Sequence, residues 1–220
     1  MSAAIARLAA DAGVPAHYLR VPPAAVGQRI ALFGGSFNPP HRGHRLVALS
    51  GLSRLAMHEV WWMVTPGNPL KSRDDLAPLA QRIEDSEAVS DHPRIRVTAF
   101  EAAIGIHHTA DVIQFLKRRY PAVKFVWLMG ADNLSGMHRW HKWYEIMRNV
   151  PVAVVNRPGA SMSVMSSPAA RAFGRFRRPE SQARKLADLP APAWTFLHVP
   201  LDPTSSTRLR RGGGCAELMS

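Results

Sequence analysis

The chain has 220 residues, 46% of them hydrophobic, which is enough for one sizeable core in a single globular domain. Its only cysteine, Cys215, excludes an internal disulfide bond and a cysteine-rich metal site. Because no stretch approaches the roughly 18 apolar residues of a membrane span, the sequence predicts a cytoplasmic protein with no membrane partner. The formal net charge of +12 favours an anionic small-molecule substrate; nucleic acid is a less favoured partner, because arginine runs such as 171–185 are typical of solvated surfaces.

The predicted elements begin after an N-terminal appendage, residues 1–27, and residues 28–220 are expected to form one domain. Short apolar, β-branched or aromatic runs predict strands at 29–33, 60–65, 94–100, 124–129, 150–155 and 194–199. Apolar residues at helical spacing predict helices at 43–56, 76–89, 109–120 and 141–149, and the Ser-, Pro- and Ala-rich residues 159–192 predict a helical excursion. This alternation predicts an α/β fold with a Rossmann-like, doubly wound parallel sheet covered by helices on both faces.

Polar, glycine-rich segments follow most of the predicted strands. They read GGSFNPPHRGH after the first strand, PGNPLK after the second, GADNLSGMHRW after the fourth, NRPG after the fifth and PLDPTSSTRLR after the last. Open parallel sheets bind ligands outside the carboxyl ends of their strands. The sequence therefore predicts a site along this edge of the sheet.

The segment GGSFNPPHRGH, residues 34–44, has the composition of a phosphate-binding turn. Gly34 and Gly35 lack a Cβ atom, so a phosphate can approach the backbone and accept hydrogen bonds from amides there and at Ser36 and Phe37. The chain then enters a helix, whose amino terminus suits an anion. We predict that these four residues bind phosphate.

His41 and His44 lie three residues apart and so share one face of the first turn of this helix. Phosphate contact is the favoured interpretation. Metal ligation is less favoured because no carboxylate or thiolate stands at ligand spacing nearby, and a packing role stays open. Neither GxGxxG nor GxxxxGKS occurs, which argues against dinucleotide oxidoreductases and P-loop proteins.

Two motifs at opposite ends of the chain resemble signatures of the nucleotidyltransferase superfamily of adenylyl- and cytidylyltransferases. GGSFNPPHRGH resembles the HxGH signature, and SSTRLR at 205–210 resembles the signature S-S-T-x-[IL]-R. Within that superfamily, TPGNPLK, TAD at 109–111, GADNLSGMHRW and RPG resemble the nicotinate-nucleotide adenylyltransferases of bacterial NAD synthesis. The resemblance runs from about Arg29 to Arg210.

The resemblance implies a fold of nucleotidyltransferase type and an enzyme whose partners are ATP and nicotinate mononucleotide, with Mg²⁺ as cofactor. Its products would be nicotinate adenine dinucleotide and pyrophosphate. No general base is then needed, because the second pKa of a phosphate monoester is about 6 and the attacking group is already largely dianionic. By the same resemblance, His41 and His44 are the catalytic residues: both contact the ATP phosphates, and His44 stabilises the transition state. A homo-oligomer is compatible with this sequence.

The resemblance also assigns residues to the two substrates. The ATP phosphates would be bound at the carboxyl-terminal motif by Ser205, Ser206, Thr207 and Arg210. Trp140 would stack on the pyridine ring, and Asp132 would face a ribose or the metal shell. The other residues expected to bind nicotinate mononucleotide are Lys71, Thr109 and Arg157, and no residue is predicted to be a dedicated metal ligand.

The chain departs from the family pattern beside Thr109 and before the second motif. His108 stands where tyrosine is usual, Val112 where a second threonine is usual, and Thr204 where an aliphatic residue is usual. These departures concern the pyridine pocket rather than the reaction class. The alternatives are another adenylyltransferase acting on nicotinamide mononucleotide or pantetheine phosphate, a cytidylyltransferase, and a non-enzymatic nucleic-acid-binding protein.

Overall fold

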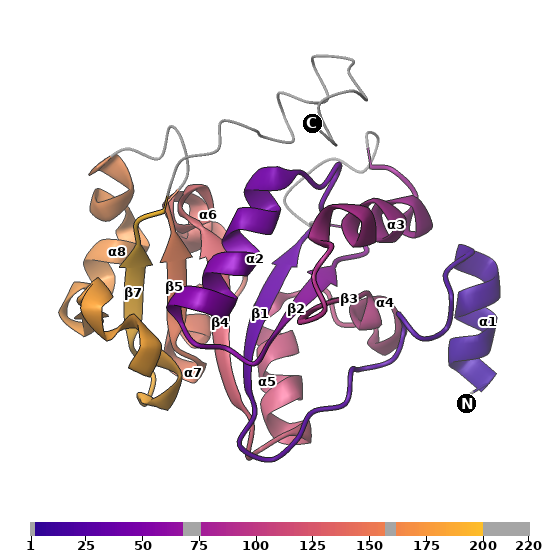
Figure 1. The fold of residues 1–220 in the computed structure, drawn as a ribbon, viewed down its shortest axis with the longest axis horizontal. Coiled ribbons are helices and arrows are strands. Elements are labelled where there is room, and N and C mark those ends of the chain that lie inside the picture. The colour runs from indigo at the N-terminus through magenta and orange to yellow at the C-terminus, as the bar shows by residue number, and fades with distance from the viewer. Residues whose placement is uncertain (1–2, 68–75, 157–161, 200–220) are drawn as a thin grey trace.

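The computed structural model describes residues 3–67, 76–156 and 162–199, and Figure 1 shows a central sheet with helices packed around it. Seven strands within these residues form one sheet in the order β3-β2-β1-β4-β5-β7-β6, and every neighbouring pair is parallel. The strands are β1 (Arg29–Gly35), β2 (Glu59–Val64), β3 (Ile95–Thr98), β4 (Lys124–Gly130), β5 (Val152–Val155), β6 (Arg177–Arg178) and β7 (Trp194–Leu197). The predicted α/β fold with a doubly wound parallel sheet is confirmed.

The described helices match the predicted ones and add several short ones. The α-helices are α1 (Ala3–Ala12), α2 (Arg42–Arg54), α3 (Leu79–Ser90), α4 (Phe100–Ile104), α5 (Thr109–Arg119), α6 (Ala131–Gly136), α7 (Trp143–Asn149) and α8 (Pro168–Ala172). The 3-10 helices are η1 (Met137–Arg139), η2 (Met162–Ser166), η3 (Gly174–Phe176) and η4 (Glu180–Asp188). The described part of the helical excursion predicted at 159–192, from residue 162 onward, is a series of short helices interrupted by β6.

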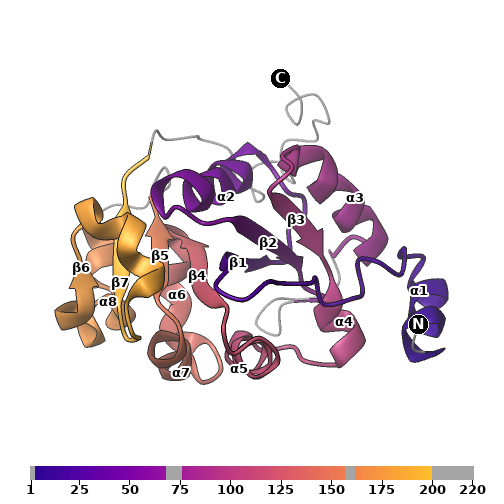
Figure 2. The ribbon, with the colours of Figure 1, turned by 60° about the horizontal axis from the view of Figure 1, so that its bottom comes forward.

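Hydrophobic side chains are buried on both faces of the sheet. Along β1, Ala31 and Phe33 pack into one core with α2, α3 and η4, whereas Ile30 and Leu32 pack into the other with α5, α6 and α7. Figure 2 shows α2 and α3 on one side of the sheet and α5 and α7 on the other. Strands buried on both faces are apolar throughout rather than alternating, which is why the predicted strands read as continuous apolar runs.

The residues between α1 and β1 run along the body of the fold. Val14 and Leu19 are buried in the core on the α2 side. The Ala99 N–H donates to the Tyr18 carbonyl at 2.8 Å, and the Tyr120 hydroxyl donates to the Pro22 carbonyl at 2.8 Å. Helix α1 has no fully buried residue and lies at one end of the molecule in Figure 1. Within the described ranges, no helix has the length and apolar character needed to cross a membrane.

Candidate active site

The direction of the chain reverses at β1, and the predicted site follows the carboxyl end of this strand. Strand β1 pairs with β2 on one side and with β4 on the other, so the chain moves outward through β2 and β3 and then returns to β4. Such a switch point, at the carboxyl ends of the strands, is where open α/β sheets bind ligands. The loop after β1 and the start of α6 after β4 flank it.

His41 and His44 hold the first turn of α2 in place with their own side chains. His41 precedes the helix in an extended conformation, and its Nδ1 accepts the Gly43 N–H at 3.1 Å. The His44 Nδ1 accepts the His41 N–H at 3.2 Å, which completes a reciprocal capping box. The two ring centroids lie 3.8 Å apart with the ring planes tilted by 32°, and His41 is 1% exposed.

This arrangement fixes the tautomer of each ring when the ring is neutral. Because each Nδ1 accepts a backbone N–H, a neutral imidazole of His41 or His44 carries its proton on Nε2. The Nε2–H group is then a donor, which is the form that binds a phosphate oxygen. The 13-residue helix α2 adds the positive end of its dipole and its first amides at the same place.

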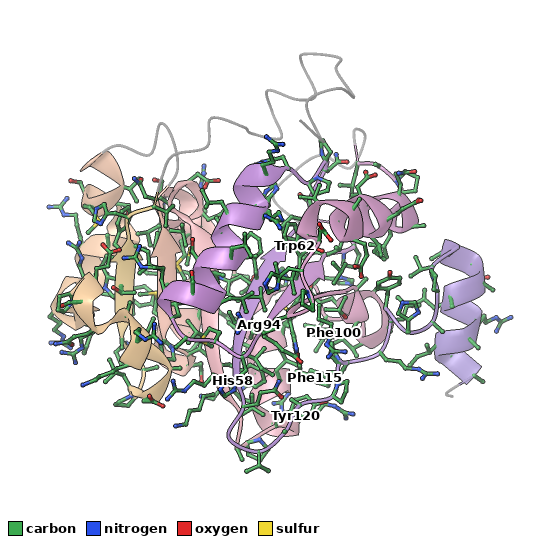
Figure 3. All side chains as sticks on the ribbon, viewed as in Figure 1. His58, Trp62, Arg94, Phe100, Phe115 and Tyr120 are labelled. Carbon is green, nitrogen blue, oxygen red and sulfur yellow. The ribbon has the colours of Figure 1, made fainter. Side chains whose placement is uncertain are left out.

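Phe37 is held in a backbone conformation that non-glycine residues rarely adopt. Its φ angle is +45° and its side chain is 3% exposed. The ring packs against Phe33, Trp62 and His44, with centroids 5.3, 4.7 and 5.0 Å away. Figure 3 places Trp62 in the upper half of the sheet, whereas His58 and Tyr120 lie toward the opposite edge. The aromatic cluster fixes the backbone of the predicted phosphate turn, and strained residues of this kind concentrate at functional sites.

Close packing accounts for both glycines of the turn. A Cβ atom on Gly34 would lie 2.7 Å from Cη2 of Trp127, and one on Gly35 would lie 3.1 Å from Cζ of Phe37. Gly34 is therefore required by the side chain of the neighbouring strand β4. Trp127 in turn contacts Trp140 edge-on at a centroid distance of 6.4 Å, so the phosphate turn and the predicted pyridine-binding residue share one packed side chain.

The two segments predicted to bind the nicotinate end are brought together. Thr109 begins α5, and Trp140 ends the turn η1 just before α7. The rings of His108 and His141 lie 4.3 Å apart, and the Lys142 Nζ donates to Asp111 Oδ1 at 3.1 Å. His108, beside Thr109, thus packs its ring against that of a second histidine, with the two planes tilted by 31°.

Asp132 is exposed in the first turn of α6, directly after β4. The described residues contain no group of three or more His, Cys, Asp or Glu side chains that could hold a metal ion by themselves. Mg²⁺ is commonly bound through substrate phosphates and one or two carboxylates rather than by a protein cage. A site of that kind needs only a carboxylate from the protein, and Asp132 is the predicted residue that could supply it.

Six of the predicted binding residues lie outside the described ranges. They are Lys71, Arg157, Ser205, Ser206, Thr207 and Arg210. Their assignments remain predictions.

Arg82 and Asn38 belong to the same loop system and were missed by sequence reasoning. The Asn38 Oδ1 accepts the Ala77 N–H at 3.1 Å, and the buried guanidinium of Arg82 donates to Ser36 and Thr65 carbonyls. A usable signal existed for Arg82, because it shares the buried face of α3 with Ile83 and Ser86. An arginine on the apolar face of a helix indicates that hydrogen-bond acceptors for its guanidinium lie inside the protein.

Comparison with known proteins shows the family to which the chain belongs. Residues 32–212 match the cytidylyltransferase-like family. A probable nicotinate-nucleotide adenylyltransferase of Rhizobium leguminosarum bv. trifolii is 54% identical over 183 residues, which cover 83% of this chain and 95% of the relative. One from Mesorhizobium japonicum is 52% identical over 191 residues, which cover 87% and 98% of the two chains. The chain belongs to the nicotinate-nucleotide adenylyltransferase family.

A solved structure shares the fold of this adenylyltransferase family member at much lower identity. The Plasmodium falciparum nicotinic acid mononucleotide adenylyltransferase complexed with NaAD superposes with a TM-score of 0.61 and 17% identity, over 84% of this chain and 83% of the other. The match in sheet and helices extends over most of the chain, which supports the adenylyltransferase fold independently of the sequence motifs.

Proposed function

We propose that the protein transfers the adenylyl group of ATP to nicotinate mononucleotide, giving nicotinate adenine dinucleotide and pyrophosphate in NAD synthesis. The observation that carries the proposal is the 54% identity to a probable nicotinate-nucleotide adenylyltransferase over 95% of its length. The geometry agrees with it, because the capped histidines and the phosphate turn lie at the switch point of the sheet.

The reaction is a displacement at the α-phosphorus of ATP. An oxygen of the 5′-phosphate of nicotinate mononucleotide forms a bond to that phosphorus, and the bond from the phosphorus to the oxygen bridging to the β-phosphate breaks. Pyrophosphate leaves with the bonding electrons, so atoms and charge balance without a proton transfer. The protein has to align the two phosphates and stabilise the charge on them.

The residues at the start of α2 are proposed to stabilise the charge on the phosphates. We assign to His41 and His44 the role of donating hydrogen bonds from Nε2 to phosphate oxygens, since their Nδ1 atoms already accept backbone N–H groups. His44 is the residue expected to stabilise the transition state. Mg²⁺, when bound with ATP, neutralises charge on the leaving phosphates.

On the acceptor side, we assign Trp140, Thr109 and Asp132 to nicotinate mononucleotide. Trp140 is half-buried against Trp127, which leaves part of its indole surface for a pyridine ring. Outside the described ranges, we also assign Lys71 and Arg157 to binding nicotinate mononucleotide. The motif at residues 205–210 is assigned to binding the ATP phosphates.

A direct assay tests the proposal. The purified protein is incubated with ATP, Mg²⁺ and, separately, nicotinate mononucleotide, nicotinamide mononucleotide or pantetheine phosphate, and pyrophosphate release and the dinucleotide product are measured. The expected result is fastest release with nicotinate mononucleotide, lost when excess chelator removes Mg²⁺. No release with any acceptor would contradict an adenylyltransferase, and full activity in chelator would contradict the proposed role of Mg²⁺.

A further inference from the structure

Arg82 is a buried cation that binds backbone carbonyls from three separate loops. Its side chain is 1% exposed. Nη1 donates to the carbonyls of Ser36 and Thr65, each at 2.7 Å, and Nε donates to the carbonyl of Ala77 at 2.9 Å. A longer contact of 3.4 Å joins Nη2 to the Pro66 carbonyl. One guanidinium thus ties together the loop after β1, the end of β2 and the residues that lead into α3.

The charge of Arg82 has no carboxylate partner among the described residues. Its polar contacts there are all to neutral carbonyl oxygens, and burial lowers its pKa to about 10. Burying a charge is costly, so the hydrogen bonds that the guanidinium donates to these carbonyls have to offset that cost. A planar group with five N–H donors can satisfy several diverging carbonyls at once, which the single ammonium of lysine cannot do in the same geometry.

The bond to Ser36 sets the direction of the next amide. The Ser36–Phe37 peptide is trans, so the Phe37 N–H points away from the Ser36 carbonyl and hence away from Arg82. Within the described part of the chain, no backbone acceptor takes this N–H. The unusual φ of +45° at Phe37 belongs to the same arrangement.

We propose that Arg82 is a positioning residue for ATP, which turns the Ser36–Phe37 peptide so that its amide faces the phosphates and places a fixed positive charge behind the turn. This inference rests on the proposed function, because it names the triphosphate as the ligand of the turn. Arg82 touches neither substrate. It acts through the backbone of residues 36–37 and, by holding Thr65 and Ala77 as well, through the loops that flank that turn.

The test measures binding of an ATP analogue with a methylene bridge between the α- and β-phosphates, by calorimetry, to wild type, Arg82→Lys and Arg82→Gln. We expect Arg82→Lys to weaken binding by about 10-fold and Arg82→Gln by more, because the lysine keeps the charge but not the fork. The KM for ATP should rise by a similar factor, while the KM for nicotinate mononucleotide stays within about 3-fold of wild type.

Tyr120→Phe is the matched control, because it also removes a side-chain hydrogen bond to a backbone carbonyl that joins two segments, at the opposite edge of the sheet (Figure 3). It should lower the melting temperature and leave analogue binding unchanged. Wild-type analogue affinity in Arg82→Lys, equal losses for both substrates, or loss of the cooperative melting transition in both Arg82 variants would each overturn the proposal in favour of a purely structural role. If wild type binds the analogue but does not adenylylate nicotinate mononucleotide, the proposed function is contradicted instead. The binding measurements would still test the role of Arg82 in that case.

Discussion

At the scale of single residues, the site depends on side chains that serve structure and chemistry together. His41 and His44 close the first turn of α2 through Nδ1, and this use of one nitrogen makes Nε2 the donor to which we assign phosphate binding. Replacing either histidine therefore removes a helix-capping hydrogen bond as well as the proposed donor to phosphate. Substitutions here therefore have to be interpreted with a stability measurement beside the kinetic one.

For His44→Ala, we expect kcat to fall by about 100-fold or more, which is the usual loss for a donor to the transition state. The variant also loses the bond from the His41 N–H to His44 Nδ1, so a modest drop in melting temperature accompanies the kinetic effect. The kinetic measurement is made well below the melting temperature of the variant. Turnover near that of wild type would rule out the assigned role of His44.

Glu101 supplies a prediction about stability and pH. Burial raises the pKa of its carboxyl from 4.5 to about 8, so between these values the folded protein holds a proton that the unfolded chain has released. The free energy of unfolding should therefore fall as the pH rises through this window. Glu101→Gln removes the titration, so the melting temperature of the variant relative to wild type should increase steadily from pH 5 to pH 8. Parallel melting curves across that range would show that Glu101 does not titrate in this way.

At the scale of elements, the site depends on how β1 and β4 pack at their carboxyl ends. Trp127 on β4 fills the space that a side chain on Gly34 would need, and it also supports Trp140. The phosphate turn and the proposed pyridine-binding turn are thus coupled through one indole. The start of α5 and the turn before α7 are joined in the same region by the His108–His141 ring contact and the Asp111–Lys142 ion pair.

A double-mutant cycle tests the coupling between β1 and β4. Gly34→Ala places a Cβ atom 2.7 Å from Trp127 Cη2, and we expect this overpacking to lower the free energy of unfolding by about 1–3 kcal/mol. Trp127→Phe removes the clashing ring edge, so adding Gly34→Ala to that background should cost much less. The measurement is urea unfolding of the four proteins. Equal costs of Gly34→Ala in both backgrounds would show that Trp127 is not the reason for the glycine.

At the scale of the whole molecule, the sequence predicted the elements that have a repeating hydrophobic pattern. It did not predict the features that depend on single contacts between distant residues. Six apolar runs separated by stretches with helical spacing were enough to predict the parallel sheet, and the site at the carboxyl ends of its strands remains a prediction. The two-residue strand β6 has no such pattern, because it consists of two exposed arginines, Arg177 and Arg178, and is too short to show a period. The short helices α4 and α6 are also too brief to show a period.

The same contrast applies to the site. The histidine pair and the glycine turn could be found from spacing and residue type, since a helix start after a buried strand has a recognisable sequence. The roles of Arg82 and Trp127 could not, because they arise from contacts across 46 residues of chain to Ser36 and from a neighbouring strand. Sequence periodicity places a residue on a face, but it does not say which loop that face meets.

The proposal that the protein adenylylates nicotinate mononucleotide is tested most directly by comparing its activity on nicotinate and nicotinamide mononucleotides. Nicotinate and nicotinamide mononucleotides differ in a carboxylate against an uncharged amide, and we expect backbone amides near Thr109 and Trp140 to suit the carboxylate and to meet the amide NH₂ donor to donor. A buried site committed to one hydrogen-bond pattern can reject the mismatch by a factor on the order of 10⁴, with His108 and Val112 expected to make this pocket somewhat less strict. The measurement is kcat/KM for the two mononucleotides at saturating ATP. We predict a strong preference for nicotinate mononucleotide, whereas equal values or a preference for the amide would contradict the nicotinate assignment.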